Sequence, residues 1–130
     1  QSRQVAIAGR KFKHGLIIKI GDERSPQSEQ LEYGNIGEVV LDLKGEYQWL
    51  EGYVGVDDET RNSYGSFQLI ILGDDLLLYE SSPIKPSEYP FKIRLNIGEI
   101  KRLTIRVLWN KEEIGVDDQI WAALANWVVY

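Results

Sequence analysis

The sequence predicts an all-β protein of about nine strands, arranged as a sandwich or a barrel. Short stretches in which apolar and polar residues alternate recur along the chain, and each ends at Gly, Pro, Asp or Asn. Residues 91–97 alternate strictly, and residues 103–107 do the same over a shorter span. Such alternation gives a strand one face toward the core and one toward water. Helical periodicity is nearly missing.

The expected strands follow one another through turns and loops. They cover residues 5–8, 15–20, 37–43, 49–54, 65–71, 76–79, 91–97, 103–107 and 121–130. Gly73, Asp74 and Asp75 predict a tight hairpin turn, because Gly and Asp readily adopt turn dihedrals. Residues 21–37 are predicted to form an unusually long polar loop. The last strand is apolar on both faces, which is typical of a central strand or of one that a neighbouring domain covers.

Composition and charge narrow the class of protein. The 130 residues are 43% hydrophobic and 27% charged, the balance of a globular domain, and we expect one domain over residues 1–130. The formal charge of −5 argues against nucleic acid as a partner, since phosphate binding needs clustered Lys and Arg. No apolar run is long enough for membrane insertion. The chain does not begin with Met, and we expect it to be excised from a larger protein.

The residues offer little for catalysis, and we expect no enzymatic activity. Cysteine is absent, which removes thiolate nucleophiles, disulfides and Cys-based zinc sites. His14 is the only histidine, and no Ser or Cys stands near it in the sequence context of a nucleophile. The neighbouring carboxylates fall on predicted turns, which does not suit the paired acids of a glycosidase.

Three acidic corners are candidate sites, at residues 57–59, 74–75 and 117–118. Successive carboxylates are costly to bury, so we expect residues 57–59 on an exposed corner. Ca²⁺ takes hard oxygen ligands of this kind, and Asp117 and Asp118 are the candidate ligands for a Ca²⁺ ion. The alternative is turn chemistry, in which Asp side chains accept hydrogen bonds from the amides of their own loops.

Aromatic and acidic residues near the predicted loops are candidates for ligand binding. An aromatic ring can stack on the apolar C–H face of a sugar, while carboxylates bond to its hydroxyl groups. Tyr64, Tyr89 and Trp109 supply rings, and Asp57 and Asp58 supply carboxylates. The alternative for each ring is an ordinary sandwich residue with one edge in water.

Two further tryptophans, Trp49 and Trp121, lie within predicted strands rather than near loops. We therefore expect both in the hydrophobic core and not at a ligand site. The basic residues Arg10, Lys11 and Lys13 are expected to be solvated strand ends.

Several motifs occur in the order found in a known domain family. They are Gly-Arg-Lys-Phe-Lys-His-Gly-Leu at residues 9–16, Leu-Asp-Leu-Lys-Gly-Glu-Tyr at 41–47, Val-Gly-Val-Asp-Asp-Glu at 54–59 with Gly-Ser-Phe at 65–67, Gly-Asp at 73–74 with Leu-Tyr at 78–79 and Ser at 81, and Asp-Asp at 117–118 with Trp-Ala at 121–122. In this order they resemble the NPCBM domain, a carbohydrate-binding module grouped with galactose-recognising modules. The resemblance covers about residues 8–124.

The resemblance implies a jelly-roll, galactose-binding-like β-sandwich. It also implies a non-catalytic module that recognises a glycan, for instance a galactose-containing one, and targets the other domains of the same polypeptide. Modules of this family belong to bacterial multidomain proteins, and the resemblance favours an extracellular or cell-surface location.

One departure from the family pattern favours another function. The family usually continues with a His-Ala or similar pair and then directly into the next strand, whereas this chain has Lys19 and Ile20 followed by the insertion at residues 21–37. If that corner frames the ligand site, the site has been rebuilt here. The alternative is therefore a protein-interaction or sensory accessory domain that kept the fold and lost sugar binding.

Overall fold

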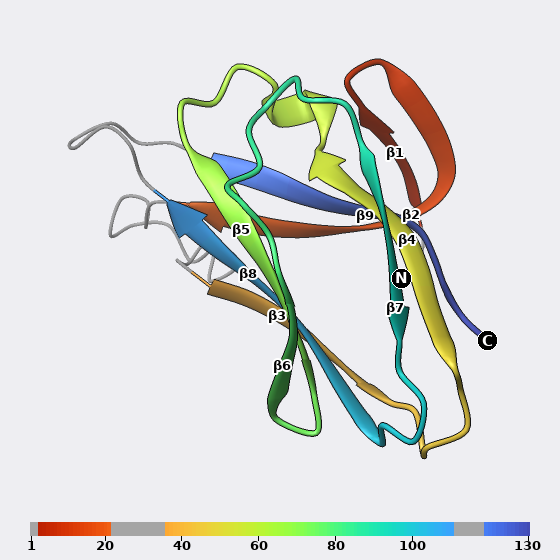
Figure 1. The fold of residues 1–130 in the computed structure, drawn as a ribbon. Helices are drawn as coiled ribbons and strands as arrows, with labels where there is room; N and C mark the ends of the chain where they lie inside the picture. Colours follow the sequence, from red (N-terminus) through yellow and green to blue (C-terminus); the bar gives the residue numbers. More distant parts are fainter. Residues whose placement is uncertain (1–2, 22–35, 111–118) are drawn as a thin grey trace, which may run out of the picture.

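The computed structural model describes residues 3–21, 36–110 and 119–130 (Figure 1). The described part consists of nine strands and one short 3₁₀ helix. These are β1 (Arg3–Ile7), β2 (Arg10–Gly21), β3 (Ile36–Asp42), β4 (Trp49–Val56), η1 (Asp58–Thr60), β5 (Ser66–Gly73), β6 (Leu76–Glu80), β7 (Phe91–Asn96), β8 (Arg102–Asn110) and β9 (Gln119–Val129). Each predicted strand overlaps one of these nine, which confirms the all-β prediction. No helix in these ranges has the length and apolar character needed to cross a membrane.

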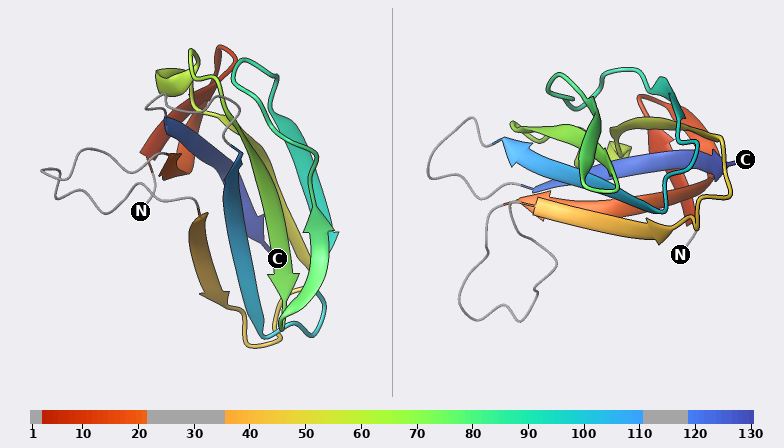
Figure 2. Two further views of the ribbon diagram at one scale, coloured as in Figure 1. Left: turned by 90° about the vertical axis from the view of Figure 1, so that its left-hand side faces the viewer. Right: turned by 60° about the horizontal axis from the view of Figure 1, so that its bottom comes forward.

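The strands form two antiparallel sheets that pack face to face (Figure 2). The first sheet has the order β1-β2-β9-β4-β7, and the second has the order β3-β8-β5-β6. This arrangement confirms the predicted jelly-roll β-sandwich. Strand β9 lies between β2 and β4, as its two apolar faces predict. The pairing of β5 with β6 confirms the hairpin predicted at residues 73–75.

The main hydrophobic core fills the space between the sheets. Along β5 the side chains of Phe67, Leu69 and Ile71 are fully buried, and from β4 Val54 and Val56 meet the same core. These are alternate residues, because successive side chains of a strand point to opposite faces. Each buried side chain of this size contributes about 1.5–3 kcal/mol, so the core holds the two sheets together.

A second, smaller apolar cluster lies on the outer face of the first sheet. It consists of Val5, Ile7, Phe12, Ala123 and Ala125. The β1–β2 hairpin folds over β9 and the end of β4 and covers this part of the face. Gly55 of β4 permits the close approach, since a Cβ atom there would lie 2.4 Å from Cγ2 of Ile7. The small residue in the Val-Gly-Val-Asp-Asp-Glu motif therefore makes room for the hairpin.

The prediction that Trp49 and Trp121 lie in the core is wrong. Both are half-buried residues of the first sheet, and Trp49 alternates with Leu50, the neighbour that joins the core. The guanidinium carbon of Arg94 lies 3.7 Å from the centroid of the Trp49 ring. The amino group of Lys19 lies 4.5 Å from the centroid of the Trp121 ring. Two-residue alternation assigns both rings to the outer face, where cations cover them.

Candidate functional site

The five candidate ligand residues all lie at one end of the sandwich, where β4 and β8 end and β5, β7 and β9 begin. We call this the loop end; it lies toward the top of Figure 1. Asp57 and Asp58 directly follow β4, Tyr64 precedes β5, and Tyr89 precedes β7. Trp109 is the second-last residue of β8. Residues that are far apart in the sequence are thus brought to one end by the antiparallel pairing.

Asp57 is buried rather than exposed, with 5% of its surface accessible. Its Oδ1 accepts a hydrogen bond from the amide of Glu59 at 2.9 Å, and its Oδ2 accepts one from the amide of Ala6 at 3.2 Å. The prediction of an exposed corner at residues 57–59 is therefore wrong for this residue. Hydrogen bonds from backbone amides offset the cost of removing the carboxylate from water.

Asp58 binds the turn between β1 and β2. Its Oδ1 accepts from the amide of Ala8 and its Oδ2 from the amide of Gly9, both at 2.9 Å. Ala8 and Gly9 have positive φ angles of 50° and 86°. Consecutive amides in such a turn make a concave donor site that suits an anion. The carboxylate of Asp58 occupies that site and stabilises the hairpin turn.

Thr60 completes this structure, and we call Asp57, Asp58 and Thr60 the latch. The hydroxyl of Thr60 donates to the carbonyl of Asp57 at 3.2 Å and accepts from the amide of Trp121 at 3.0 Å. The latch therefore joins β1, β4 and β9. The turn-chemistry alternative is confirmed for Asp57, which accepts from the amide of Glu59 in its own loop. The amides that bind Asp58 belong instead to a segment some 50 residues away in sequence. Their role in ligand binding stays a prediction.

The three aromatic candidates differ sharply in exposure. Tyr64 is 65% exposed and Tyr89 is 82% exposed, whereas Trp109 is only 8% exposed and belongs to the core. A Cβ atom at Gly65 would lie 2.6 Å from Nε1 of Trp109, so the backbone of Gly65 covers the edge of the indole. The two tyrosines are the candidates whose rings a ligand can reach directly.

The predicted metal ligands Asp117 and Asp118 lie outside the described residues. Within the described ranges, no group of three or more His, Asp or Glu side chains gathers in a way that could hold a metal ion. The acidic corner at Asp74 has a turn role, because its Oδ1 accepts from the amides of Arg102 at 2.9 Å and Lys101 at 3.2 Å. Ca²⁺ binding at Asp117 and Asp118 stays a prediction.

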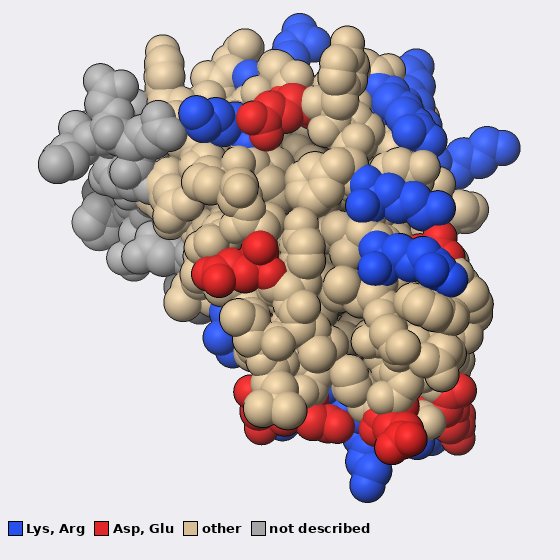
Figure 3. Space-filling model, viewed as in Figure 1, with Lys and Arg blue, Asp and Glu red and all other residues tan. Residues whose placement is uncertain are grey.

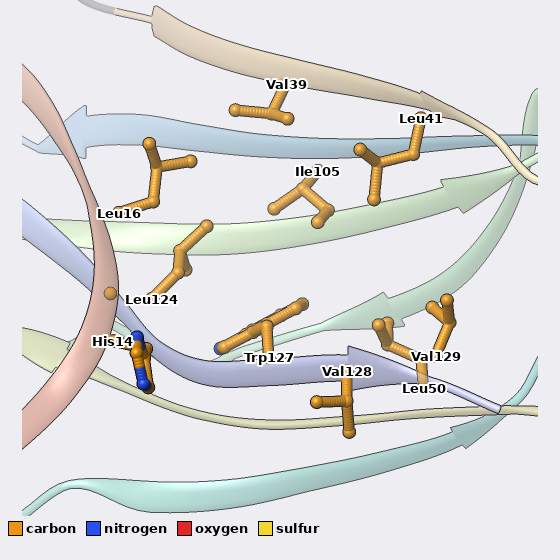
Figure 4. A pocket seen from close by; sticks show the side chains of 11 residues that line it. His14, Leu16, Val39, Leu41, Leu50, Ile105, Leu124, Trp127, Val128 and Val129 are labelled. Carbon is orange, nitrogen blue, oxygen red and sulfur yellow. The ribbon is translucent and has the colours of Figure 1, made fainter. Parts of the chain in front are cut away.

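An apolar groove opens between the sheets, along β2, β9 and β3 (Figure 4). Its volume is about 380 Å³, and its lining includes Leu16, Val39, Leu41, Leu50, Ile105, Leu124, Trp127, Val128 and Val129. His14 is the one lining side chain with polar atoms besides Trp127, whose Nε1 donates to the carbonyl of Tyr53 at 2.7 Å. Sugar sites need several convergent polar groups, so the groove does not suit a sugar.

Comparison with known proteins adds to this geometry. The model of the NPCBM/NEW2 domain family matches residues 1–125. No curated protein sequence matches the chain. Similarity to solved structures confirms the predicted galactose-binding-like fold.

Three solved structures from Clostridium perfringens share the fold. The first is CBM51 from GH95 in complex with methyl-galactose, with a TM-score of 0.69 and 17% identity over 100% of this chain and 81% of that chain. The second contains a catalytic domain of ZmpB with its CBM51-1 and CBM51-2 domains, with a TM-score of 0.65 and 20% identity over 98% of this chain and 12% of that chain. The third is CBM51-2 in complex with GlcNAc and INT domains of ZmpB, with a TM-score of 0.63 and 14% identity over 98% and 26%. This chain therefore spans a small part of the two longer chains.

Proposed function

The chain belongs to the NPCBM/NEW2 domain family, and we propose that this non-catalytic carbohydrate-binding module holds its glycan at the loop end. The observation that carries the proposal is the exposure of Tyr64 and Tyr89 at the same end of the sandwich. A ring that is held by a rigid strand end and open to solvent can stack on the apolar face of a sugar. The methyl-galactose complex of a similar module supports a galactose-containing ligand.

Backbone hydrogen bonds that begin at the latch order the segment that leads to Tyr64. The amide of Thr60 donates to the carbonyl of Asp57 at 2.9 Å, and the amide of Ser63 donates to the carbonyl of Thr60 at 3.1 Å. These bonds hold the backbone up to the residue before Tyr64. A segment that is ordered before binding loses less conformational entropy when the ligand arrives. The exposed side chains of Arg61 and Asn62 supply hydrogen-bond donors and an acceptor for sugar hydroxyls.

Tyr89 follows a tight turn between β6 and β7. The amide of Lys85 donates to Oε1 of Glu88 at 3.1 Å, and Ser87 has a positive φ of 71°. The amide of Phe67 donates to the carbonyl of Ile84 at 3.0 Å, which joins this connection to the start of β5. Tyr89 therefore leaves a fixed turn, and its ring is a second stacking surface at the loop end.

The targeting role follows from the same family. A glycan-binding module holds an attached domain close to the glycan, and this raises the effective concentration of that domain at its substrate. The structure of ZmpB in which CBM51 domains accompany a catalytic domain supports this role. The attached domain of this chain is expected to act on material that carries the recognised glycan.

Isothermal titration with methyl-galactoside, lactose and GlcNAc tests the proposal. We expect Tyr89→Ala to weaken the affinity for the bound sugar about five- to tenfold, while Tyr89→Phe keeps most of it, because stacking uses the ring. Leu76→Ala removes a 70% exposed apolar side chain at the opposite end and serves as the control. If Tyr89→Ala binds as tightly as the unaltered protein, the ligand lies elsewhere.

The apolar groove favours a second function, that of an interaction domain. Leu41 and Val128 lie at the groove and are 37% and 53% exposed, so a partner's apolar side chain could cover them. In the simplest case the partner is a second copy of the chain. Sedimentation velocity would then show association that rises with concentration and is lost in Val128→Asp. A monomer at every concentration, together with sugar binding, contradicts this second function.

A further inference from the structure

Basic and aromatic side chains lie together on the outer face of the first sheet. Glu51 of β4 pairs with Arg94 of β7, and Tyr53 pairs with Lys92. All four side chains belong to alternate positions and therefore share one face. We call this the basic face. Figure 3 shows Lys and Arg side chains gathered on this side of the molecule, over β7 and the β1–β2 hairpin.

Aromatic rings hold two arginines of the basic face in place. The guanidinium carbon of Arg94 lies 3.7 Å from the centroid of Trp49. The guanidinium carbon of Arg10 lies 4.6 Å from the centroid of Tyr53 and also covers Phe12. A cation over a ring is attracted by the ring's quadrupole and keeps its edge free for hydrogen bonds. Binding an anion then costs less side-chain entropy than it would with two mobile arginines.

The carboxylate of Glu51 lies close to both cations of β7, Lys92 and Arg94. Lys92 Nζ lies 2.9 Å from Oε1 of Glu51, and Arg94 Nε lies 3.6 Å from Oε2. The hydroxyl of Tyr130 donates to Oε2 of the same carboxylate. The side chains of Lys92 and Arg94 are nevertheless each 51% exposed. Two cations beside Glu51, together with Arg10, make the basic face positive although the whole chain carries −5.

We propose that the basic face binds an anionic glycan, one whose sugars carry carboxylate or sulfate groups. A guanidinium presents parallel N–H donors that match the paired oxygens of these groups. The outward positions of Lys92 and Arg94 are about 7 Å apart along β7, so successive cations follow the strand direction. A row of charges on a flat sheet suits a polymer chain, whereas the tyrosines at the loop end suit a single sugar.

The same geometry disfavours nucleic acid. Affinity for a phosphate backbone depends on how many phosphates Lys and Arg side chains neutralise, and the basic face offers three cations, Arg10, Lys92 and Arg94. This site is independent of the proposed sugar site, and neither requires the other.

The first test compares an oligogalacturonate with its fully methyl-esterified form by isothermal titration. The two probes share the same sugars and differ in charge, so the basic face predicts binding of the acid and little binding of the ester. A carrageenan oligosaccharide, which carries sulfate but no carboxylate, distinguishes binding of sulfate from binding of carboxylate. The affinity is expected to fall as salt is raised to about 0.15 M, since exposed charges are screened. Equal binding of the acid and the ester would overturn the proposal.

The second test uses charge-removing variants with a matched control. We expect Arg10→Gln and Arg94→Gln each to weaken the affinity for oligogalacturonate about fivefold. Arg106→Gln removes the same charge from β8 of the other sheet, where Arg106 Nε pairs with Glu38 at 2.7 Å, and should leave the affinity unchanged. Trp49→Leu tests the positioning of Arg94, because it keeps the charge and removes the ring. We expect Trp49→Leu to weaken the affinity for oligogalacturonate less than Arg94→Gln does.

Further outcomes separate this proposal from its rivals. Tyr89→Ala should keep the affinity for oligogalacturonate, and Arg94→Gln should keep the affinity for methyl-galactoside. Unaltered affinity in the double variant of Arg10 and Arg94 would overturn the proposal, and so would a lack of binding by every anionic probe at low salt. A single-stranded oligonucleotide of equal charge that binds as tightly as the glycan would show a general polyanion surface and also overturn it.

Discussion

The latch and the two exposed tyrosines lie at the same end of the sandwich, yet the latch side chains bind the backbone and the tyrosine side chains face solvent. Asp57 and Asp58 accept four backbone hydrogen bonds between them and tie the β1–β2 hairpin to β4. Tyr64 and Tyr89 expose most of their surface to solvent. A conspicuous acidic motif can therefore have a structural role, while the solvent-exposed aromatic rings of the same end lie further along the chain.

The largest expected effect is on the latch. Asp57→Ala should lower the free energy of unfolding by about 3 kcal/mol, because it leaves the partly buried amides of Ala6 and Glu59 without their acceptor. Urea unfolding measures this loss. Glu59→Ala removes the exposed carboxylate of the same corner and should stay within about 0.5 kcal/mol of the unaltered protein. Equal stability of Asp57→Ala and Glu59→Ala would mean that the latch does not stabilise the fold.

The next effect tests the contact beneath the latch. In Gly55→Ala the new Cβ atom would meet Cγ2 of Ile7 at 2.4 Å, and the resulting strain should cost about 2 kcal/mol. Shortening the side chain of Ile7 relieves this clash. The free energy of unfolding lost through Ile7→Ala should therefore be smaller in the Gly55→Ala background than in the unaltered protein. A double-mutant cycle by urea unfolding measures this coupling. Strict additivity would contradict the close packing of the hairpin on β4.

Stabilisation by added Ca²⁺ tests whether the acidic residues outside the latch, Asp117 and Asp118, form a metal site. If Asp117 and Asp118 bind Ca²⁺, as the sequence predicts, a tenfold excess over Kd should stabilise the fold by about 1.4 kcal/mol. Thermal unfolding with and without CaCl₂ measures the shift in Tm. The shift should vanish when both residues are changed to Asn and persist in Asp58→Asn. Loss of the shift in Asp58→Asn would assign the ion to the latch instead.

The smallest effect concerns the pH dependence of the basic face. The hydrogen bond from Tyr130, followed by that from Lys92, lowers the pKa of Glu51 below its usual value of 4.5. A carboxyl group of this kind stabilises the folded state above its unfolded pKa, and the stabilisation is lost as pH falls through the folded pKa. Glu51→Gln should therefore lower Tm slightly near neutral pH and have no effect in strong acid. A Tm difference that persists in acid would point to packing rather than charge.

Much of the fold could be predicted because alternation is a local property. The alternation within residues 91–97 and 103–107 predicts strands whatever they pair with, and Gly73 with Asp74 predicts a hairpin. The start of β2 was harder to predict. The alternation predicts this strand from residue 15, but β2 begins at Arg10, and Phe12 is the one buried side chain between Arg10 and His14.

The candidate site could be predicted only in part because its contacts are not local. The sequence places Asp57 and Asp58 at the end of a strand, but it does not reveal that their donors are the amides of Ala6, Ala8 and Gly9. The outward positions of Glu51 and Arg94 can be inferred from alternation. Their meeting on one face depends on the pairing of β4 with β7, which a single sequence does not state.

The most direct measurement combines titration with methyl-galactoside and thermal unfolding for two variants, Asp58→Asn and Tyr89→Ala. We expect Asp58→Asn to lower Tm while keeping the affinity, because the carboxylate holds the hairpin turn. We expect Tyr89→Ala to lower the affinity while keeping Tm, because the ring is exposed. The opposite pattern, with binding lost in Asp58→Asn at unchanged Tm, would make the acidic motif the ligand site and refute the proposed site at the tyrosines.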